Sequence, residues 1–312
     1  MQIWKRALAK IIKPNILVIG GTGFIGYHLL LEAKRKGWKT TSISLNKPKK
    51  YRFVKGVKYI KVDISNQNDL KRKIKKYFDY VVNLGGYGSH IPFEKGGDKL
   101  FKSHFMGLVN LINVISKAKL KKFIQAGSSE EYGDAKAPQN ENSKGSVNSP
   151  YAMAKLSCTN FLKNLYKTEK YPSTVLRFFL VYGDKQDSNR ILPQIIKGCL
   201  NNKKFAVTKG DQMRDFCHIK DVIDAIFLTL KSKKANGEIL NIGYGKPKKI
   251  KFIINYIQKT ISKGKPVFGK LKYRDNENLK LYPNIKKAKS LLGWSPKISL
   301  KTGLNSVIKS YR

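Results

Sequence analysis

A tyrosine and a lysine four residues apart are the clearest candidates for acid/base chemistry. Tyr151 and Lys155 stand in the segment PYAMAK at 150–155, and positions i and i+4 lie on one face of a helix. A free phenol ionises only near pH 10, whereas a neighbouring cation stabilises the phenolate. The pair could therefore exchange a proton with a substrate oxygen.

A second polar group follows a short apolar run at 122–126. The run continues into GSSEEYG at 127–133. Ligands of open α/β sheets bind at the carboxyl ends of the strands. The hydroxyl of Ser128 is thus a candidate for the same site.

A glycine-rich turn predicts a dinucleotide site. The apolar run 16–19 leads directly into GGTGFIG at 20–26, and a helical pattern follows. Gly20 permits a tight turn, Gly23 lets the backbone approach a pyrophosphate, and Gly26 lets helix and strand pack closely. The N-terminus of the helix offers N–H groups and its positive dipole end to phosphates.

The end of the next apolar run bears on which dinucleotide is bound. NAD sites commonly place an Asp or Glu about 20 residues beyond the glycines. Here the sequence is SISLNK at 42–47, and three further cations follow by residue 52. A hydroxyl from Ser44 with cations such as Lys47 suits a 2′-phosphate, so we expect NADP(H), with NAD as the alternative.

The elements that must position these groups alternate along the chain. Several of the apolar runs are apolar on both faces, as parallel strands covered by helices must be. We expect a doubly wound parallel α/β sheet of the Rossmann type. The runs fall at 15–20, 40–45, 58–62, 80–84, 122–126, 173–181 and 238–242, and helical stretches at 26–36, 68–77, 100–118 and 150–168.

After about residue 184 the alternation loosens, although 221–230 and 237–242 indicate a return to the sheet. This pattern predicts a sheet domain interrupted by two insertions. We expect residues 14–183 and 212–245 to bind the dinucleotide. A smaller C-terminal substrate-binding region would comprise residues 184–211 and 246–312.

The composition bounds the class of protein. The 312 residues include 63 Lys or Arg and 20 Asp or Glu, a formal charge of +43, and 41% of them are hydrophobic. That apolar fraction excludes a disordered polycation. Only nine of the basic residues are Arg, the residue that specific phosphate and base recognition favours. We interpret the lysines mainly as a solvated surface and do not expect nucleic acid as a partner.

The sequence also bears on compartment. Three cysteines, Cys158, Cys199 and Cys217, show no paired metal spacing and no disulfide framework, which fits a reducing compartment. No metal site is expected. No apolar run approaches the ~20 residues that span a bilayer. We interpret the basic, amphipathic segment 1–13 as a short helix packed on the protein, and expect a cytoplasmic chain without membrane insertion.

Together these motifs resemble the extended short-chain dehydrogenases/reductases, in particular their NAD-dependent epimerase/dehydratase group, which modifies nucleotide sugars. The resemblance runs from Ile16 to the C-terminus. Besides the motifs above it includes the segments 62–64 (VDI), 83–86 (NLGG), 176–183, 213–222 (MRDFCHIKDV) and 291–296 (LLGWSP).

The resemblance implies roles for matching residues. Tyr151 would be the acid/base, Lys155 would hold the nicotinamide ribose, and Ser128 would hydrogen-bond the reacting sugar oxygen. Arg214 and Arg274 would hold the substrate diphosphate, as the Arg fork suits. The cofactor would contact Gly20, Gly23, Phe24, Ile25, Gly26, Ser44, Lys47, Asp63, Ile64, Leu84, Gly85, Tyr151 and Lys155, and the substrate would also contact Ser129.

Four residues depart from the family pattern. Leu180 and His104 stand where the family often has Asn, and the pair Gly85-Gly86 replaces a pair of Ala. Leu180 removes a polar contact to the substrate. We interpret His104 as structural, and expect the glycine pair to leave the backbone near the nicotinamide less crowded.

Three reactions share this scaffold: 4-epimerisation, 4,6-dehydration and 4-keto reduction. Glu130 could abstract the C5 proton in a dehydration, but the string at 127–133 also resembles 4-keto-sugar reductases, and a buried or capping carboxylate would explain Glu130 equally well. The missing acid after the second strand, Leu180, and the segments 213–221 and 272–277, which resemble a 4-keto-reductase, favour reduction.

We therefore expect an NDP-4-keto-6-deoxyhexose 4-reductase or 4-epimerase that supplies sugars for surface polysaccharides. A 4,6-dehydratase is the alternative, and a non-enzymatic nucleic-acid-binding protein is the alternative of another class. Related enzymes pair the helices that match 100–118 and 150–168 in a dimer. We expect a homodimer, although core packing explains many of the same apolar residues.

Overall fold

Seven parallel strands form the centre of the molecule. The computed structural model describes residues 13–74, 77–88, 91–274 and 277–312, so nearly all of the expected helix at 1–13 lies outside the described residues. They are β1 Asn15–Ile19, β2 Lys39–Ser44, β3 Lys58–Lys61, β4 Tyr80–Asn83, β5 Lys122–Ser128, β6 Ser173–Phe178 and β11 Ile239–Ile242. Their order in the sheet is β11-β6-β5-β4-β1-β2-β3, and every neighbouring pair is parallel. The prediction of a doubly wound α/β sheet is thus confirmed. The order reverses between β1 and β4, where such sheets bind their ligands.

The strands are short, and all except the edge strand β3 are largely buried on both faces. In β1, Ile16 and Val18 pack on one side of the sheet, and Leu17 and Ile19 pack on the other. This alternation follows from the two-residue period of a strand.

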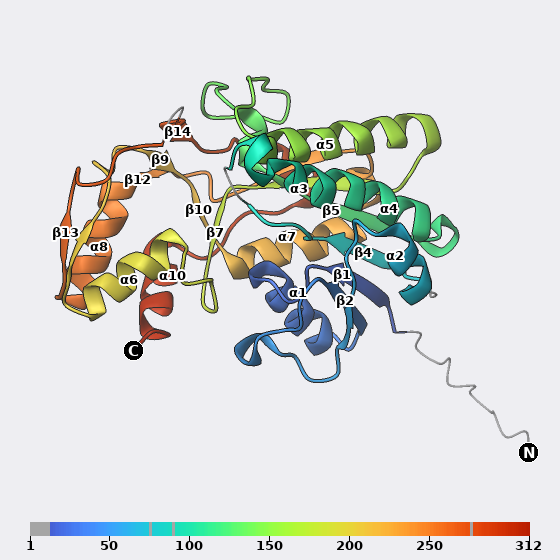
Figure 1. Ribbon diagram of the computed structural model, residues 1–312, viewed down its shortest axis with the longest axis horizontal. Helices are drawn as coiled ribbons and strands as arrows, with labels where there is room; N and C mark the ends of the chain where they lie inside the picture. Colours follow the sequence, from blue (N-terminus) through green and yellow to red (C-terminus); the bar gives the residue numbers. More distant parts are fainter. Residues whose placement is uncertain (1–12, 75–76, 89–90, 275–276) are drawn as a thin grey trace, which may run out of the picture.

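Helices cover both faces of this sheet (Figure 1). One layer contains α1 Phe24–Arg35, α7 Ile219–Lys231 and α9 Lys286–Leu292. The opposite layer contains α2 Gln67–Lys73, α3 Asp98–Phe101, α4 Gly107–Val114 and α5 Pro150–Glu169. The segments 221–230 and 237–242 do return to the sheet, the first within the covering helix α7 and the second as the edge strand β11.

Two elements differ from their expected form. The helix expected at 100–118 spans 98–114 and contains a π-helical turn at Lys102–Met106. The strand expected at 173–181 divides into β6 and β7 Leu180–Tyr182, because β7 pairs with β10 Phe216–His218 rather than with the main sheet. Pairing with a distant segment leaves no local signal in the sequence.

A second body of structure follows β7. Helices α6 Ile191–Leu200, α8 Ile250–Ile261 and α10 Leu300–Lys309 enclose a separate apolar core. Short strand pairs flank it, seen at the left of Figure 1. These are β8 Lys204–Ala206 with β13 Lys265–Val267, and β9 Met213–Arg214 with both β12 Lys248–Lys249 and β14 Lys280–Leu281.

The last part of the chain divides between the two cores. Helix α9 and Trp294 pack on the sheet, whereas α10 belongs to the second core. The indole N–H of Trp294 donates to the carbonyl of Asp221 at 3.0 Å, and the Asp221 carboxylate accepts the N–H groups of Lys297 and Ile298. Segments 213–222 and 291–296, both part of the family resemblance, therefore contact each other and join the two bodies.

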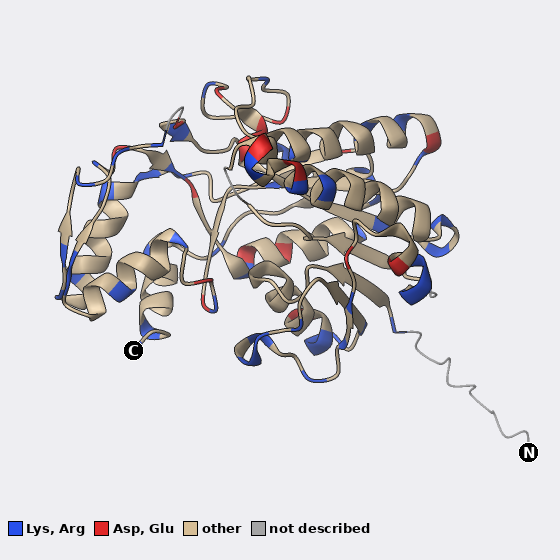
Figure 2. Cartoon of the chain, in the orientation of Figure 1, with Lys and Arg blue, Asp and Glu red and all other residues tan. Residues whose placement is uncertain are grey.

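Lys and Arg are distributed over helices and loops in both bodies (Figure 2). Cys158, Cys199 and Cys217 are buried and unbridged. Within residues 13–74, 77–88, 91–274 and 277–312 there is no helix long and apolar enough to cross a membrane. The same part of the chain contains no cluster of three His, Cys, Asp or Glu suited to a metal ion.

Candidate active site

The turn between β1 and α1 requires glycine at two of the predicted positions. Gly20 has φ +74°, and a Cβ there would lie 2.7 Å from the carbonyl oxygen of Leu84. A Cβ on Gly26 would lie 2.3 Å from the carbonyl oxygen of Gly20. Distances this short would force the backbone of the turn to move, so no larger residue fits.

The helix that follows leaves its N-terminus open. Gly23 caps α1 without a side-chain hydrogen bond, and the first turn holds no acidic residue. The first N–H groups of a helix, here those of Phe24, Ile25 and Gly26, have no intrahelical acceptor and carry the positive dipole end. The turn therefore fits the pyrophosphate of a dinucleotide.

The end of β2 lies against this turn. The buried Ser44 accepts a hydrogen bond from the N–H of Thr22 at 3.4 Å. Lys47 is exposed in the loop that follows. Lys49 and Arg52, which the sequence counted among the cations for a 2′-phosphate, instead form ion pairs with Asp187 at 3.5 and 3.1 Å.

The ends of β3 and β4 supply the other residues expected near the cofactor. The Asp63 carboxylate accepts the N–H and the hydroxyl of Ser65, at 2.9 and 2.7 Å. Ile64 is buried, and Leu84 is half-buried. At Gly85 a Cβ would lie 2.7 Å from the Ile19 side chain, so the backbone just after β4 approaches β1 closely at the point where the strand order reverses.

The space beside Gly86 is filled by His104, so the expectation of a less crowded backbone was wrong. A Cβ on Gly86 would lie 2.1 Å from the His104 ring, which the π-helical turn presents. The Nε2–H of His104 donates to the carbonyl of Tyr87 at 3.0 Å. Nδ1 is buried and accepts no hydrogen bond from the described residues. His104, interpreted from the sequence as structural, thus borders the candidate site.

The tyrosine and lysine lie on the inner face of α5. The Ser149 hydroxyl caps this helix by accepting the N–H of Ala152 at 3.1 Å, and Pro150 begins it. The half-buried Tyr151 lies near Lys155, whose Nζ is 5.8 Å from the phenol ring centre. The predicted spacing therefore places both groups on one face, as expected.

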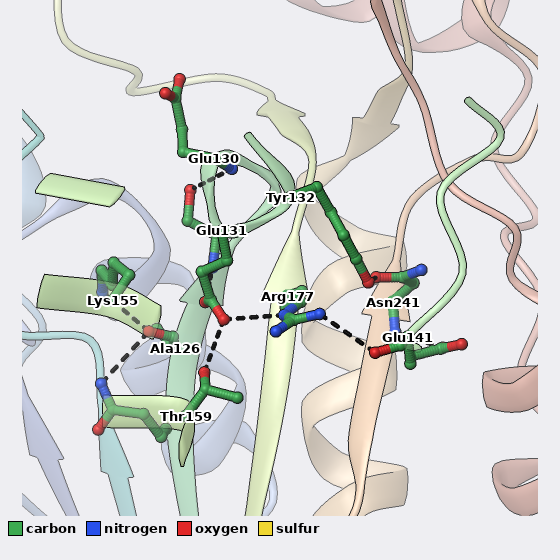
Figure 3. Close-up of polar contacts among 11 residues, drawn as sticks. Ala126, Glu130, Glu131, Tyr132, Glu141, Lys155, Thr159, Arg177 and Asn241 are labelled. Atoms are coloured by element: carbon green, nitrogen blue, oxygen red, sulfur yellow. Dashed lines mark hydrogen bonds and ion pairs between the residues drawn. The ribbon is translucent and has the colours of Figure 1, made fainter. Parts of the chain in front are cut away.

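The sheet holds the lysine in place. Lys155 is 4% exposed, and its Nζ donates to the carbonyl of Ala126 at 2.8 Å (Figure 3). Ala126 lies in β5, two residues before Ser128, the last residue of that strand. The Ser128 hydroxyl accepts the N–H of Glu130 at 3.2 Å, so its own proton can be donated elsewhere. The structure thus brings Ser128, Tyr151 and Lys155 to one end of β5.

A buried carboxylate beside Ser128 was missed by the sequence analysis. Glu131 lies in the short 3₁₀ turn Ser129–Tyr132 and accepts hydrogen bonds from Ser128, Thr159 and Arg177 (Figure 3). Its contact with Ser128 forms a capping box, whose Ser-x-x-Glu spacing is visible in the sequence. Thr159 and Arg177 are 28 and 46 residues away, so no local pattern reveals these two contacts. The half-buried Ser129 begins the same turn.

Two arginines, Arg214 and Arg274, and two carboxylates, Glu130 and Glu277, lie near one another. Arg214 pairs with Glu277, and Arg274 lies exposed nearby. Burial lowers the pKa of Arg214, and the repulsion from Arg274 adds to this, while Glu277 and Glu130 oppose it. An arginine remains charged despite such a shift. This cluster can therefore bind an anion if the anion replaces Glu277 at Arg214 or binds Arg214 together with Glu277.

Comparison with known proteins gives one family. The sequence model of the NAD dependent epimerase/dehydratase family matches residues 16–243. The uncharacterized protein MJ1055 of Methanocaldococcus jannaschii is 32% identical over 310 residues, which cover 93% of this chain and 94% of that protein. The dTDP-D-glucose 4,6-dehydratase of Bos taurus is 27% identical over 322 residues, covering 96% of this chain and 88% of the relative.

A solved structure agrees over the whole fold. The crystal structure of the UDP-glucose 4-epimerase of Thermotoga maritima, determined with UDP-glucose, superposes with a TM-score of 0.89 at 25% identity. The match covers 96% of this chain and 98% of the epimerase. Relatives of the chain thus include both a dehydratase and an epimerase, so similarity alone does not select one reaction.

Proposed function

Since the chain belongs to the NAD-dependent epimerase/dehydratase family, we propose that it reduces or epimerises C4 of a nucleotide sugar, with an NDP-4-keto-6-deoxyhexose as the preferred substrate. The observation that carries this proposal is the meeting of Ser128, Tyr151 and Lys155 at the end of β5, anchored by the bond from Lys155 to Ala126. A hydroxyl pair backed by a cation is suited to proton exchange with an alcohol or ketone.

A nicotinamide dinucleotide would supply the hydride for this chemistry. The glycine turn at 20–26 and the open N-terminus of α1 would hold its pyrophosphate. Asp63, Ile64, Leu84 and Gly85 would border its adenine and nicotinamide ends along the edge of the sheet. Lys155 would hold the nicotinamide ribose, since its ammonium group retains donors beyond the one used by Ala126.

We further propose NADP(H) rather than NAD(H). No carboxylate occurs at 42–47, where an NAD site would have one, and Ser44 and Lys47 are suited to a 2′-phosphate. Because Lys49 and Arg52 are engaged by Asp187, this preference depends mainly on Ser44 and Lys47. Cofactor fluorescence titrations would test it: NADPH should bind more tightly than NADH, and Lys47→Ala should reduce the difference. Tighter binding of NADH would refute the preference.

Tyr151 would act as the acid. As the C4 carbonyl carbon is reduced, the phenol gives its proton to the C4 oxygen, and the reverse transfer occurs in oxidation. The positive charge of Lys155, 5.8 Å from the ring centre, stabilises the phenolate left behind. Ser128 would donate to the same sugar oxygen and hold it in line with Tyr151.

Arg214 and Arg274 would bind the substrate diphosphate, with Ser129 nearer the sugar. The planar guanidinium donates two parallel hydrogen bonds to phosphate oxygens. Under this proposal residues 14–183 and 212–245 bind the cofactor, and 184–211 and 246–312 complete the substrate site.

We also propose a cytoplasmic homodimer formed through the α3–α4 and α5 faces, where Met106 and Met153 are exposed. Analytical ultracentrifugation would test the dimer.

A 4,6-dehydratase is the second candidate, favoured by one observation. Glu130 lies close enough to Arg214 for its charge to oppose the lowering of the Arg214 pKa by burial, so its carboxylate is on the side proposed for the substrate. A dehydratase needs such a group to remove the C5 proton. Conversion of NDP-glucose to a 4-keto-6-deoxy product, and its loss in Glu130→Gln, would identify this reaction.

The proposal is tested by mixing the protein with NADPH and a panel of NDP-4-keto-6-deoxyhexoses that differ in nucleotide base. We expect oxidation of NADPH with at least one substrate. A parallel assay without added NADPH follows scrambling at C4 of unmodified NDP-hexoses, which would identify an epimerase. If neither assay shows turnover, the reductase and epimerase proposals fail.

The alternative of a nucleic-acid-binding protein is tested by measuring nucleic-acid affinity against salt concentration. A steep salt dependence without sequence preference would show that the charge of +43 attracts nucleic acid only electrostatically.

A further inference from the structure

The Glu131 carboxylate joins three elements of the sheet domain. Its Oε1 accepts the backbone N–H of Ser128 at 2.7 Å. Its Oε2 accepts the Thr159 hydroxyl on α5 at 2.7 Å and Nε of Arg177 on β6 at 2.8 Å. The Glu131 side chain is 0% exposed and that of Arg177 is 5% exposed. One buried group thus connects the end of β5, helix α5 and strand β6 (Figure 3).

The neighbouring residues leave room for this carboxylate. At Gly127 a Cβ would lie 2.7 Å from Glu131 Oε1 and 3.0 Å from Arg177 Cγ. A larger residue at 127 would therefore displace the carboxylate or the arginine. Arg177 is held in turn by the Glu141 carbonyl and by the Tyr132 ring, 4.5 Å from its guanidinium carbon. A buried charge needs such a partnered setting, because unpaired burial is costly.

The contact to Thr159 ties the carboxylate to the helix that carries Tyr151 and Lys155. Residues 151, 155 and 159 are spaced by four and lie along one face of α5. Lys155 fixes this face to Ala126, and Thr159 fixes it to Glu131. The carboxylate that holds α5 through Thr159 also holds the backbone N–H of Ser128.

We propose that Glu131 is a positioning residue that sets the Ser128 hydroxyl relative to Tyr151 by binding Ser128 and Thr159 with one carboxylate. Its effect on turnover rests on the proposed function, whereas its effect on the order of segment 127–133 does not. Displacements of about 1 Å in such arrangements can cost about 10²-fold in rate.

Only a carboxylate can satisfy all three partners. Ser128 N–H, Thr159 O–H and Arg177 Nε–H all point hydrogen atoms at Glu131, and an ionised carboxylate is acceptor-only. The variant Glu131→Gln keeps the volume but turns an NH₂ group toward at least one of these donors. At least one contact is lost, and Arg177 loses its buried counter-charge.

The experiment compares Glu131→Gln and Thr159→Val with Thr229→Val. Thr159 and Thr229 are both 0% exposed on helices that cover the sheet, and each loses one hydroxyl hydrogen bond, to Glu131 or to the Ala225 carbonyl. We expect kcat to fall about 10²-fold in Glu131→Gln and about tenfold in Thr159→Val, with KM and NADPH affinity nearly unchanged. Thr229→Val should keep kcat, and Thr159→Ser should restore it.

Amide hydrogen exchange provides a readout that does not need turnover. Segment 127–133 should exchange faster in Glu131→Gln and Thr159→Val than in Thr229→Val at matched global stability. If the wild type is inactive on every substrate, the proposed function fails and this exchange still decides the positioning role. Unchanged exchange in segment 127–133 would overturn the positioning role. If the wild type is active, equal kcat values in Thr159→Val and Thr229→Val would also overturn it. Both outcomes can be read from the threonine variants even if Glu131→Gln does not fold.

Discussion

The His104 imidazole packs against the Tyr151 phenol with ring centres 5.4 Å apart and ring planes at 73°. Its Nε2–H is engaged by the Tyr87 carbonyl, which leaves Nδ1 as an acceptor. Burial lowers the pKa of His104 to about 3, and the charge of Lys155 adds to the effect. The wall beside Tyr151 is therefore uncharged near neutral pH, and Lys155 supplies the positive charge there.

The depressed pKa of His104 makes stability depend on pH. The unfolded imidazole binds a proton below its ordinary pKa of 6.5, whereas the folded one stays neutral until about 3. The unfolded state therefore gains protons first, so the folded state loses stability as pH falls from 6.5 toward 3. Compared with His104→Asn, whose side chain does not titrate, the wild type should lose ~1.4 kcal/mol more per pH unit in this window.

Urea unfolding at several pH values would measure the free energy of unfolding of the wild type and of His104→Asn, and so the difference in their pH dependence. The comparison cancels other groups, such as Asp215, whose burial raises its pKa to about 6 and acts in the opposite direction. Parallel curves for the wild type and His104→Asn would contradict the prediction.

Removing the phenolic hydroxyl of Tyr151 should lower kcat far more than it weakens cofactor binding. Tyr151→Phe keeps the ring that packs on His104 and loses the proton donor. General acid catalysis contributes about 10²- to 10⁴-fold, so kcat should fall by this factor. NADPH titration should give an affinity close to that of the wild type, because most of the expected cofactor contacts lie elsewhere, in the glycine turn and at the strand ends. A Tyr151→Phe variant with more than a tenth of the wild-type kcat would remove Tyr151 from the acid/base role.

Local spacing made the centre of this site predictable. The glycine turn lies within one strand–turn–helix unit, and Tyr151 and Lys155 lie on one helix, so the geometry follows from the periods of these elements. The placement of Ser128 followed from its position at the end of an apolar run. In each case the contact depends on neighbours in sequence.

Contacts between distant segments were not predictable in this way. Arg52 lies 135 residues before its partner Asp187, and Glu277 lies 63 residues after Arg214. As a result, a cation counted toward a 2′-phosphate proved to be committed elsewhere. His104 was interpreted as structural because nothing in the sequence shows that a π-helical turn directs it at Tyr151.

The two ends of helix α1 offer a substitution in the glycine turn, Gly26→Ala, and a control just after the helix, Gly37→Ala. Gly26→Ala places a Cβ 2.3 Å from the Gly20 carbonyl oxygen, whereas Gly37, just after α1, has open space around its Cβ position and φ +75°. We expect Gly26→Ala to weaken cofactor binding more than tenfold, because the turn must open. Gly37→Ala should cost about 1 kcal/mol of stability through its positive φ and leave binding intact. Equal cofactor affinities in the two variants would show that the turn does not hold the dinucleotide.

Substitutions of Arg214 and of Glu277 should change KM for the nucleotide sugar in opposite directions. Arg214→Ala should raise KM for the nucleotide sugar about 10- to 100-fold, since a hydrogen bond to a charged group contributes about 1.5–3 kcal/mol. Arg72→Ala, which removes an exposed arginine paired with Asp69, controls for the loss of net charge.

Glu277→Gln should lower KM about threefold, because the carboxylate competes with the diphosphate for Arg214 and a partly exposed ion pair contributes ~0.2–1 kcal/mol. The matched control is Glu238→Gln, which removes a carboxylate paired with Lys287 away from this cluster. Both variants add the same positive charge to the protein, so a general electrostatic attraction of the substrate would change both KM values equally. A higher KM in Glu277→Gln alone would instead mean that Glu277 accepts hydrogen bonds from the substrate, and that Arg214 positions this carboxylate rather than the diphosphate.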